Sequence, residues 1–251
     1  MAPLTPRPRL GTSLLRLFTV QGSWNYEYML GLGIGVAEEP LLRDLPGGPG
    51  GAAYHAALGR GTHFFNAHPY LAGLAVGAAA RAEHDGASPE QIERLRTALA
   101  GPLGSLGDRL VWAGWLPFAA GLAIAGIALG LGWTAVAGFL VVYNAGHLAL
   151  RWWALRAGWA RGTRVPTALH HPGLRRAMAF TAPAMALALG LALPLGASYL
   201  AAPFAAGGRI ALAGGTALGL VLLWWRPMNL TGLRLGLTLI AAALVAGWVW
   251  R

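Results

Sequence analysis

Two polar side chains in the first third of the sequence, Asn66 and His68, stand among aromatic residues and directly precede Pro69. An amide and an imidazole flanked by aromatic rings can hydrogen-bond to the polar groups of a small-molecule substrate. The same groups can instead cap helix ends and hold a proline break, because a buried polar group needs a partner whatever its function. Asn66 and His68 are therefore candidates for a substrate path, and Pro69 is a candidate structural residue.

A second segment combines residues that disturb helices with a carboxylate: Gly101, Pro102, Gly104 and Gly107 precede Asp108. Glycine permits close backbone approach, and broken helices at membrane depth often line substrate paths. The alternative is a tight turn in which Asp108 caps the helix that follows. We expect the turn, with the glycines and proline as its structural motif, and keep Asp108 as a third candidate for the substrate path.

A third segment contains Trp24, Asn25 and Glu27. A tryptophan can anchor a subunit or domain contact while neighbouring polar groups fix its register. The alternative is a tryptophan at the membrane interface beside a solvated glutamate. We treat these residues as candidates for a subunit or domain contact.

The sequence lacks the patterns that mark an independent enzyme, since it has no nucleophile with an adjacent base, no phosphate loop and no metal motif. His170 and His171 are adjacent, but a polar loop fits them better than a metal site because no acid or cysteine accompanies them. His147 lies in an apolar run, where a hydrogen-bonded structural role is expected and a proton relay is the alternative. We predict no catalytic residue, no metal and no cofactor.

Composition indicates a membrane protein. The chain is 56% hydrophobic and 11% charged, whereas soluble domains average roughly 45–50% apolar and ~25% charged residues. All nine acids lie at or before Asp108, and eleven arginines with no carboxylate follow, which divides the chain into residues 1–108 and 109–251. Because these arginines lie between apolar runs, the net charge of +10 favours anionic lipids over nucleic acid as a partner.

Five stretches meet or approach the ~20 apolar residues that a membrane-spanning helix needs. They are residues 110–131, 133–150, 177–201, 210–225 and 233–250. The expected fold is therefore an all-α polytopic membrane protein with about five transmembrane helices in residues 109–251. Arginines concentrate in the loops after the second and fourth spans, which predicts a cytoplasmic N-terminus and an external C-terminus.

Interfacial and re-entrant helices are expected before these spans. Leucines at helical spacing in residues 10–20 predict an amphipathic surface helix and not a cleavable signal. Residues 52–65 form another expected helix, and residues 69–80 are apolar but, at ~12 residues, suit a re-entrant or interfacial segment. Ser88 begins a further helix, with a glutamine three residues later at the capping-box spacing.

Three motifs in this order are specific enough to suggest a family. They are Trp-Asn-Tyr-Glu at 24–27, Phe-Phe-Asn-Ala-His-Pro-Tyr-Leu-Ala at 64–72, and Gly-Pro-Leu-Gly-Ser-Leu-Gly-Asp at 101–108. Together they resemble the IID membrane subunit of the mannose/fructose/sorbose-type sugar phosphotransferase system, and residues 144–162 add a weaker similarity. Tyr28 and Arg109 depart from the residues that commonly follow the first and third motifs in that family.

The resemblance implies a non-catalytic subunit in the cytoplasmic (inner) membrane. It would pair with a IIC membrane subunit in a hetero-oligomer and import a hexose that cytoplasmic IIA and IIB subunits phosphorylate. Two alternatives are a diverged IID-like regulatory or interaction protein and a stand-alone helical transporter.

Overall fold

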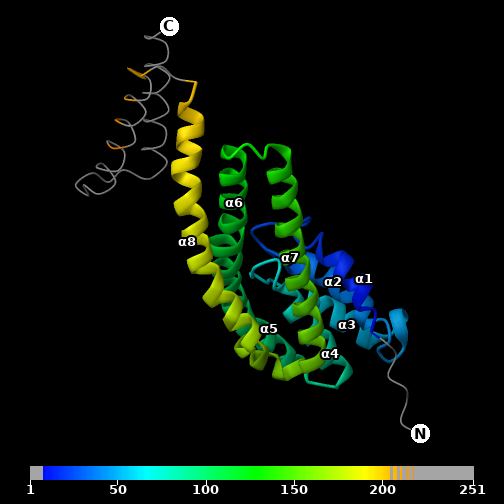
Figure 1. Cartoon of the computed structure of the whole chain (residues 1–251). Helices are drawn as coiled ribbons and strands as arrows, with labels where there is room; N and C mark the ends of the chain where they lie inside the picture. Colours follow the sequence, from blue (N-terminus) through cyan, green and yellow to red (C-terminus); the bar gives the residue numbers. More distant parts are fainter. Residues whose placement is uncertain (1–7, 204–205, 208–209, 211–213, 215–216, 218–251) are drawn as a thin grey trace, which may run out of the picture. The chain divides into compact units, whose positions relative to one another are not determined.

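The computed structural model describes residues 8–203, 206, 207, 210, 214 and 217, which form helices joined by short loops (Figure 1). Among these described residues, two isolated backbone bridges are the only strand-like pairings. By compactness the chain divides into Met1–Leu193 and Pro194–Arg251. The fold is described for the first unit, to which α8 contributes all but its C-terminal end.

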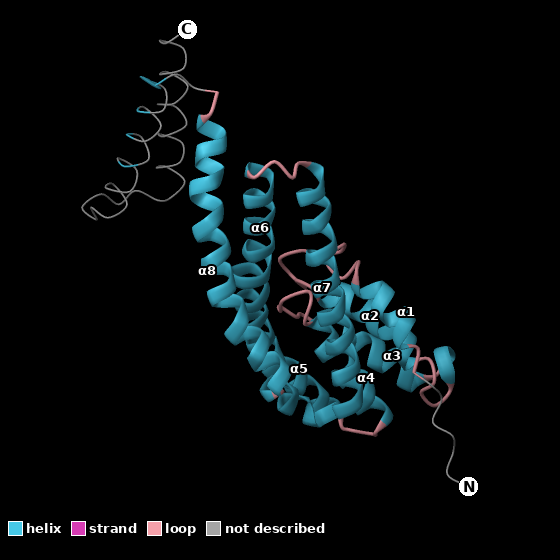
Figure 2. Ribbon diagram, viewed as in Figure 1, coloured by secondary structure: helices cyan, strands magenta, loops and turns pink. Residues whose placement is uncertain are grey.

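Eight α-helices and three short segments of other helical geometry follow one another in the described chain (Figure 2). The α-helices are α1 (Leu10–Leu17), α2 (Gly31–Leu42), α3 (Ala52–Gly61), α4 (Ala72–His84), α5 (Pro89–Gly107), α6 (Leu116–Ala128), α7 (Trp133–Arg161) and α8 (Pro172–Ala201). The other segments are the 3-10 turns Gly48–Gly50 and Gly162–His170 and the π-helical segment Asp108–Trp115.

Helix α4 is the centre of the first unit, because almost every residue from Ala72 to Ala82 is buried. It packs mainly against α7, and glycines on both helices bring the two backbones close together. A Cβ atom at Gly77 would lie 2.5 Å from the Leu155 carbonyl oxygen, and one at Gly158 would strike the backbone of α4. Small residues at such a crossing maximise contact between apolar helices.

Within the described part of the chain, two continuous helical stretches are long and apolar enough to cross a membrane: Pro89–Ala128, and Trp133–Ala201 with its 3-10 segment. Their exposed side chains include many large apolar residues, such as Leu122, Leu140 and Leu187. This surface suits lipid better than water. The predicted spans 110–131, 133–150 and 177–201 fall on these stretches, whereas 210–225 and 233–250 lie almost wholly outside the described residues.

The local predictions for the N-terminal part hold for the helices themselves. Residues 10–20 contain α1, residues 52–65 contain α3, and residues 69–80 contain most of α4. Ser88 caps α5, and the Ser88 and Gln91 side chains form the expected reciprocal capping box. The re-entrant character of residues 69–80 and the surface location of α1 stay predictions.

The expected turn at residues 101–108 is wrong. Helix α5 continues without a break into the π-helical segment, and Asp108 has helical dihedral angles of φ −61° and ψ −44°, so it does not cap a new helix. Leu99 and Leu103 are buried on one face of α5, and this burial keeps the chain helical across the glycines and Pro102. The backbone widens only at Asp108–Trp115, before Pro117, whose missing N–H and bulky ring disturb the preceding turn.

A consequence is that one helix runs through the proposed boundary between residues 1–108 and 109–251. That division rests on the distribution of charge and stays a prediction about the roles of the two parts.

Candidate substrate path and subunit contact

The first two motifs lie side by side because their loops pair through the backbone. The Phe65 N–H donates to the Tyr28 carbonyl oxygen over 3.2 Å, and the Leu30 N–H donates to the Phe65 carbonyl oxygen over 2.9 Å. Met29, between these bonds, has a φ of 51°. A side chain other than glycine rarely adopts this left-handed conformation unless its surroundings enforce it. The pairing of the two loops is therefore a specific structural feature of this region, because it holds Met29 in that conformation.

Asn25 shapes the first loop. Its Oδ1 accepts hydrogen bonds from the N–H groups of Glu27 and Tyr28, over 2.9 and 2.8 Å. This local turn explains the asparagine without a partner molecule. Trp24 and Glu27 remain exposed, and the Trp24 ring packs edge-on against Tyr26 with a centroid separation of 4.9 Å.

Four exposed aromatic side chains gather on the paired loops, and we call them the aromatic loop surface. They are Trp24, Tyr26, Tyr28 and Phe64, with exposed fractions of 46, 84, 37 and 56%. Asn66 follows on the same second loop and is also exposed. Large aromatic residues presented together in this way are typical of contact surfaces.

His68 joins the second motif to the third. It is 2% exposed and lies against Gly107, where a Cβ atom would come within 2.9 Å of His68 Nδ1 and still closer to its Cβ and Cγ atoms. Its ring also contacts those of Tyr70 and Trp112, at centroid distances of 5.0 and 4.9 Å. Gly107 therefore provides the space that His68 occupies.

His68 is a neutral hydrogen-bonding group at physiological pH. Burial lowers its pKa from 6.5 to about 4, although the nearby charge of Asp108 opposes this shift. Nδ1 accepts from the Tyr70 N–H over 3.2 Å, which leaves the proton of the neutral ring on Nε2. No described residue supplies a hydrogen-bond partner for Nε2. This imidazole can therefore donate to a polar group that enters the site.

The structure brings some predicted residues together and leaves others apart. His68, Pro69 and Gly107 are buried, whereas Asn66 and Asp108 are exposed. A Cβ at Gly104 would make one ordinary contact, with Ala67 at 3.9 Å, and one at Gly101 would meet nothing within 4 Å. Pro102 is exposed. Of the third motif, Gly107 has the closest packing role.

Sequence reasoning missed a buried ionic cluster beneath the second loop. Arg96 donates to the Gly61 carbonyl oxygen over 2.9 Å, and its Nη1 lies 3.6 Å from Glu38 Oε2. Arg60 and Glu83 form a second ion pair at 2.7 Å. Burial raises the Glu38 pKa from 4.5 to about 8, against the opposing effect of Arg96. The residues come from α2, α3, α4 and α5, so no local sequence pattern identifies them.

A second missed group ties α7 to Tyr70. The hydroxyls of Tyr70 and Tyr143 are 2.8 Å apart, and the Arg151 guanidinium lies 4.5 Å from the centre of the Tyr70 ring. Arg151 also donates to the Leu17 carbonyl oxygen at the end of α1. His147 is hydrogen-bonded to Asn144 over 3.1 Å. A buried arginine with backbone and aromatic partners can hold three chain segments together.

The histidine pair shows no ligand arrangement in the described part of the chain, where no three potential metal-binding side chains converge. His171 Nδ1 instead accepts from the Gly173 N–H over 3.2 Å at the start of α8.

Long helical stretches with an apolar exterior define an all-helical protein of the membrane class in the described residues. The family model for the mannose/fructose/sorbose family IID component of the phosphotransferase system matches residues 7–199. The chain belongs to this family.

Several relatives support this assignment. The sorbose-specific EIID component of Klebsiella pneumoniae is 34% identical over 161 residues, which cover 62% of this chain and 58% of that protein. The mannose-specific EIID component of Escherichia coli K12 is 31% identical over 153 residues, with coverages of 59 and 53%. The matches thus span little more than half the length of these relatives.

Solved structures show the same likeness in three dimensions. A chain in the cryo-electron microscopy structure of the mannose transporter ManYZ with microcin E492 gives a TM-score of 0.56 and 26% identity, covering 72% of this chain and 67% of that one. A structure described as a membrane protein gives a TM-score of 0.63 at the same identity and coverages.

Proposed function

We propose that this chain is the IID subunit of a sugar permease, pairs with a IIC membrane subunit, and takes part in hexose import coupled to phosphorylation by IIA and IIB. The family match over residues 7–199 carries the proposal. The convergence of the three motifs around the paired loops and His68 supports it.

Asn66, His68 and Asp108 are the proposed contributions to the sugar path. Asn66 is exposed on the second loop, and Asp108 is close enough to influence the pKa of His68. His68 Nε2 has no hydrogen-bond partner among the residues that the structure describes. An amide, an imidazole N–H and a carboxylate supply both donors and acceptors, as sugar hydroxyls require.

The aromatic loop surface is the proposed contact with IIC. Trp24 and Glu27 project from a loop whose shape Asn25 fixes, so an aromatic anchor and a charged group stand on a defined backbone. Trp24→Ala should reduce co-purification of IIC, since exposed tryptophans are frequent binding hot spots. Trp133→Ala is the matched control, because Trp133 is 86% exposed at the start of α7, far along the chain from the motifs. Equal loss in both variants would count against a specific contact.

The decisive experiment combines assembly with transport. The chain is co-expressed with a IIC subunit, purified, and tested in vesicles for sugar uptake that depends on IIA, IIB and a phosphate donor. Co-purification with coupled uptake supports the proposal. A stable complex without uptake favours a regulatory IID-like protein, and uptake by the chain alone favours a stand-alone transporter.

Phosphate transfer provides a separate test of the non-catalytic role. The purified chain should acquire no stable label from a complete phosphate-donor system. Stoichiometric label on His68, His170 or His171 would overturn this part of the proposal.

The proposed orientation places the N-terminus in the cytoplasm and the C-terminus outside, as the arginine distribution favours. Reporters fused to each end test it. Two ends on the same side would mean that the number of spans is not five.

A further inference from the structure

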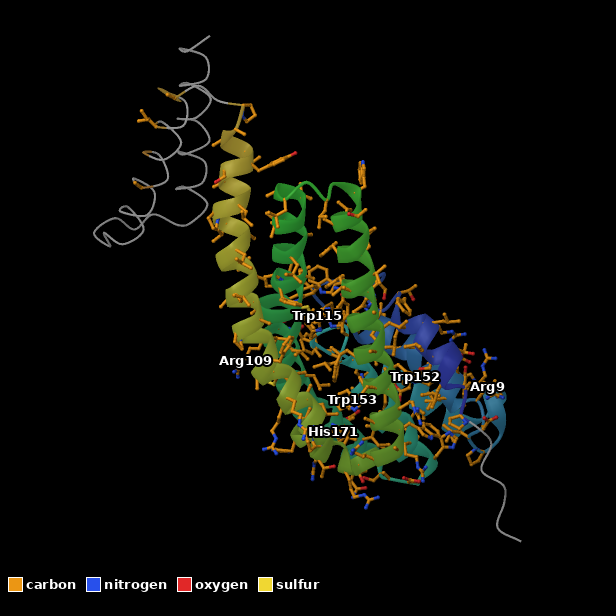
Figure 3. The ribbon with its side chains drawn as sticks, in the orientation of Figure 1. Arg9, Arg109, Trp115, Trp152, Trp153 and His171 are labelled. Carbon is orange, nitrogen blue, oxygen red and sulfur yellow. The ribbon has the colours of Figure 1, made fainter. Side chains whose placement is uncertain are left out.

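A cavity of about 330 Å³ lies within the first unit, between the π-helical segment, α7 and the first turns of α8. Its walls are largely apolar and include Leu110, Leu150, Leu174 and Ala177. Trp115, Trp153 and His171 also line it, whereas Trp152 lies outside it on α7 (Figure 3). The volume falls at the lower end of the ~300–1,000 Å³ range of ligand pockets.

The cavity lies where the apolar stretches of α7 and α8 meet the arginine-rich segment between them. Residues 133–150 and 177–201 are the apolar stretches of α7 and α8, and six arginines lie between or beside them from Arg151 to Arg176. Such a position corresponds to the boundary between acyl chains and headgroups. An occupant there is expected to have an apolar body and a charged end.

The segments that form this cavity carry positive charge. Arg109, Arg175 and Arg176 are exposed, and each is the direct sequence neighbour of a residue that lines the cavity. No carboxylate follows Asp108 in the sequence. Basic pockets between transmembrane helices recognise anionic lipid headgroups. The positive charge of the segments that line the cavity therefore favours an anionic occupant.

His171, which lines the cavity, adds a hydrogen-bond donor. Its Nδ1 accepts from the Gly173 N–H, so the proton of the neutral imidazole is on Nε2. The Trp153 ring packs on it with a centroid separation of 5.9 Å. Among the described residues Nε2 has no hydrogen-bond partner. A phosphate oxygen can accept from this N–H while arginines supply charge.

We propose that this cavity binds an anionic membrane phospholipid, with an acyl chain between α7 and α8 and the phosphate near His171, Arg175 and Arg176. The site requires only the membrane location of the family, so it stands whether or not the chain transports a sugar. It would fix the relative positions of α7 and α8 by filling the space between them.

The test measures lipid retained by the purified full chain in neutral detergent, by native mass spectrometry. The probes are phosphatidylglycerol and phosphatidylcholine with identical acyl chains. Phosphatidylglycerol should be retained in preference to phosphatidylcholine. Arg175→Gln with Arg176→Gln should lower that preference roughly tenfold or more, since each basic residue near a membrane surface contributes to anionic lipid binding. Equal retention of both lipids by the parent chain would overturn the proposal.

Two matched variants locate the site. Ala177→Phe fills the cavity and should abolish retention, whereas Ala179→Phe adds the same ring at an exposed position of α8 and should not. Unchanged retention in Ala177→Phe refutes the location. Loss of IIC co-purification in that variant, with lipid retention intact, would assign the cavity to the subunit contact instead. If Ala177→Phe does not fold, the surface arginine variant decides the question through its lipid preference.

Discussion

Replacement of Gly107 by alanine tests whether packing at His68 organises the three motifs. Alanine is favoured over glycine in a helix interior by about 1 kcal/mol, so local propensity alone predicts stabilisation. The structure predicts the opposite. A Cβ at position 107 would lie 2.9 Å from His68 Nδ1 and still closer to its Cβ and Cγ atoms, whereas carbon atoms pack best ~3.5–4.0 Å apart.

His68 has little room to move away. It is 2% exposed and is held between Gly107 and the rings of Tyr70 and Trp112. Overpacking of this kind typically costs ~1–3 kcal/mol. A displacement of this size lies at the upper end of that range, so the net effect of Gly107→Ala should be destabilisation by about 2 kcal/mol after the gain in propensity.

Gly101→Ala is the matched control, because it lies in the same helix and a Cβ there meets nothing within 4 Å. It should leave stability unchanged or raise it by up to about 1 kcal/mol. The assay heats detergent-purified protein and measures the fraction that remains monodisperse. If Gly107→Ala survives heating as well as Gly101→Ala does, the described contact with His68 is not what limits stability, and the reasoning fails.

Three further predictions concern charged residues. The Glu38 pKa of about 8 exceeds the ordinary 4.5, so between these pH values the folded chain keeps a proton that the unfolded chain has lost. The contribution of this group to stability therefore falls as pH rises from about 4.5 to 8. Glu38→Gln should flatten that part of the thermal stability profile, and a parallel decline in both proteins would contradict this prediction. Arg60→Met should destabilise by about 3 kcal/mol, because it leaves Glu83 as a largely buried unpaired charge, and adding Glu83→Leu should recover part of the loss in the same heating assay. The Asp108→Asn and Asp108→Ala variants should both assemble with IIC, since Asp108 lies inside a continuous helix. Both should transport less sugar if the Asp108 charge serves the sugar path. Loss of assembly in the alanine variant alone would show that Asp108 caps a helix after all.

Local signals in the sequence predicted local structure well. The capping box at Ser88 depends on residues within one turn, and α7 and α8 contain apolar runs whose length alone indicates a span. These features need no knowledge of distant contacts. Local signals alone also explain the error at residues 101–108. Glycine and proline suggested a turn there, whereas burial of Leu99 and Leu103 kept the chain helical.

The arrangement of the candidate site required tertiary contacts. His68 and Gly107 meet across 39 positions of sequence, 107 minus 68, and neither residue type specifies the other. The pairing of Glu38 with Arg96 likewise joins α2 to α5. Sequence spacing found the motifs but could not tell which of their residues pack inside and which face outward.

That distinction separates two kinds of role among the motif residues. Gly107 and Pro69 are buried, so they act through the shape of this chain, whereas Trp24 and Asn66 are exposed and have little intramolecular packing to lose. Changes at buried positions should therefore lower the stability of the isolated chain, and changes at exposed positions should matter only when a partner or a sugar is present. His68 belongs to both kinds, because its ring is enclosed while its Nε2 lacks a partner among the described residues. A buried polar atom without a partner is stable only if water or a ligand hydroxyl forms a hydrogen bond with it. His68 is therefore the residue at which packing and the proposed sugar path meet.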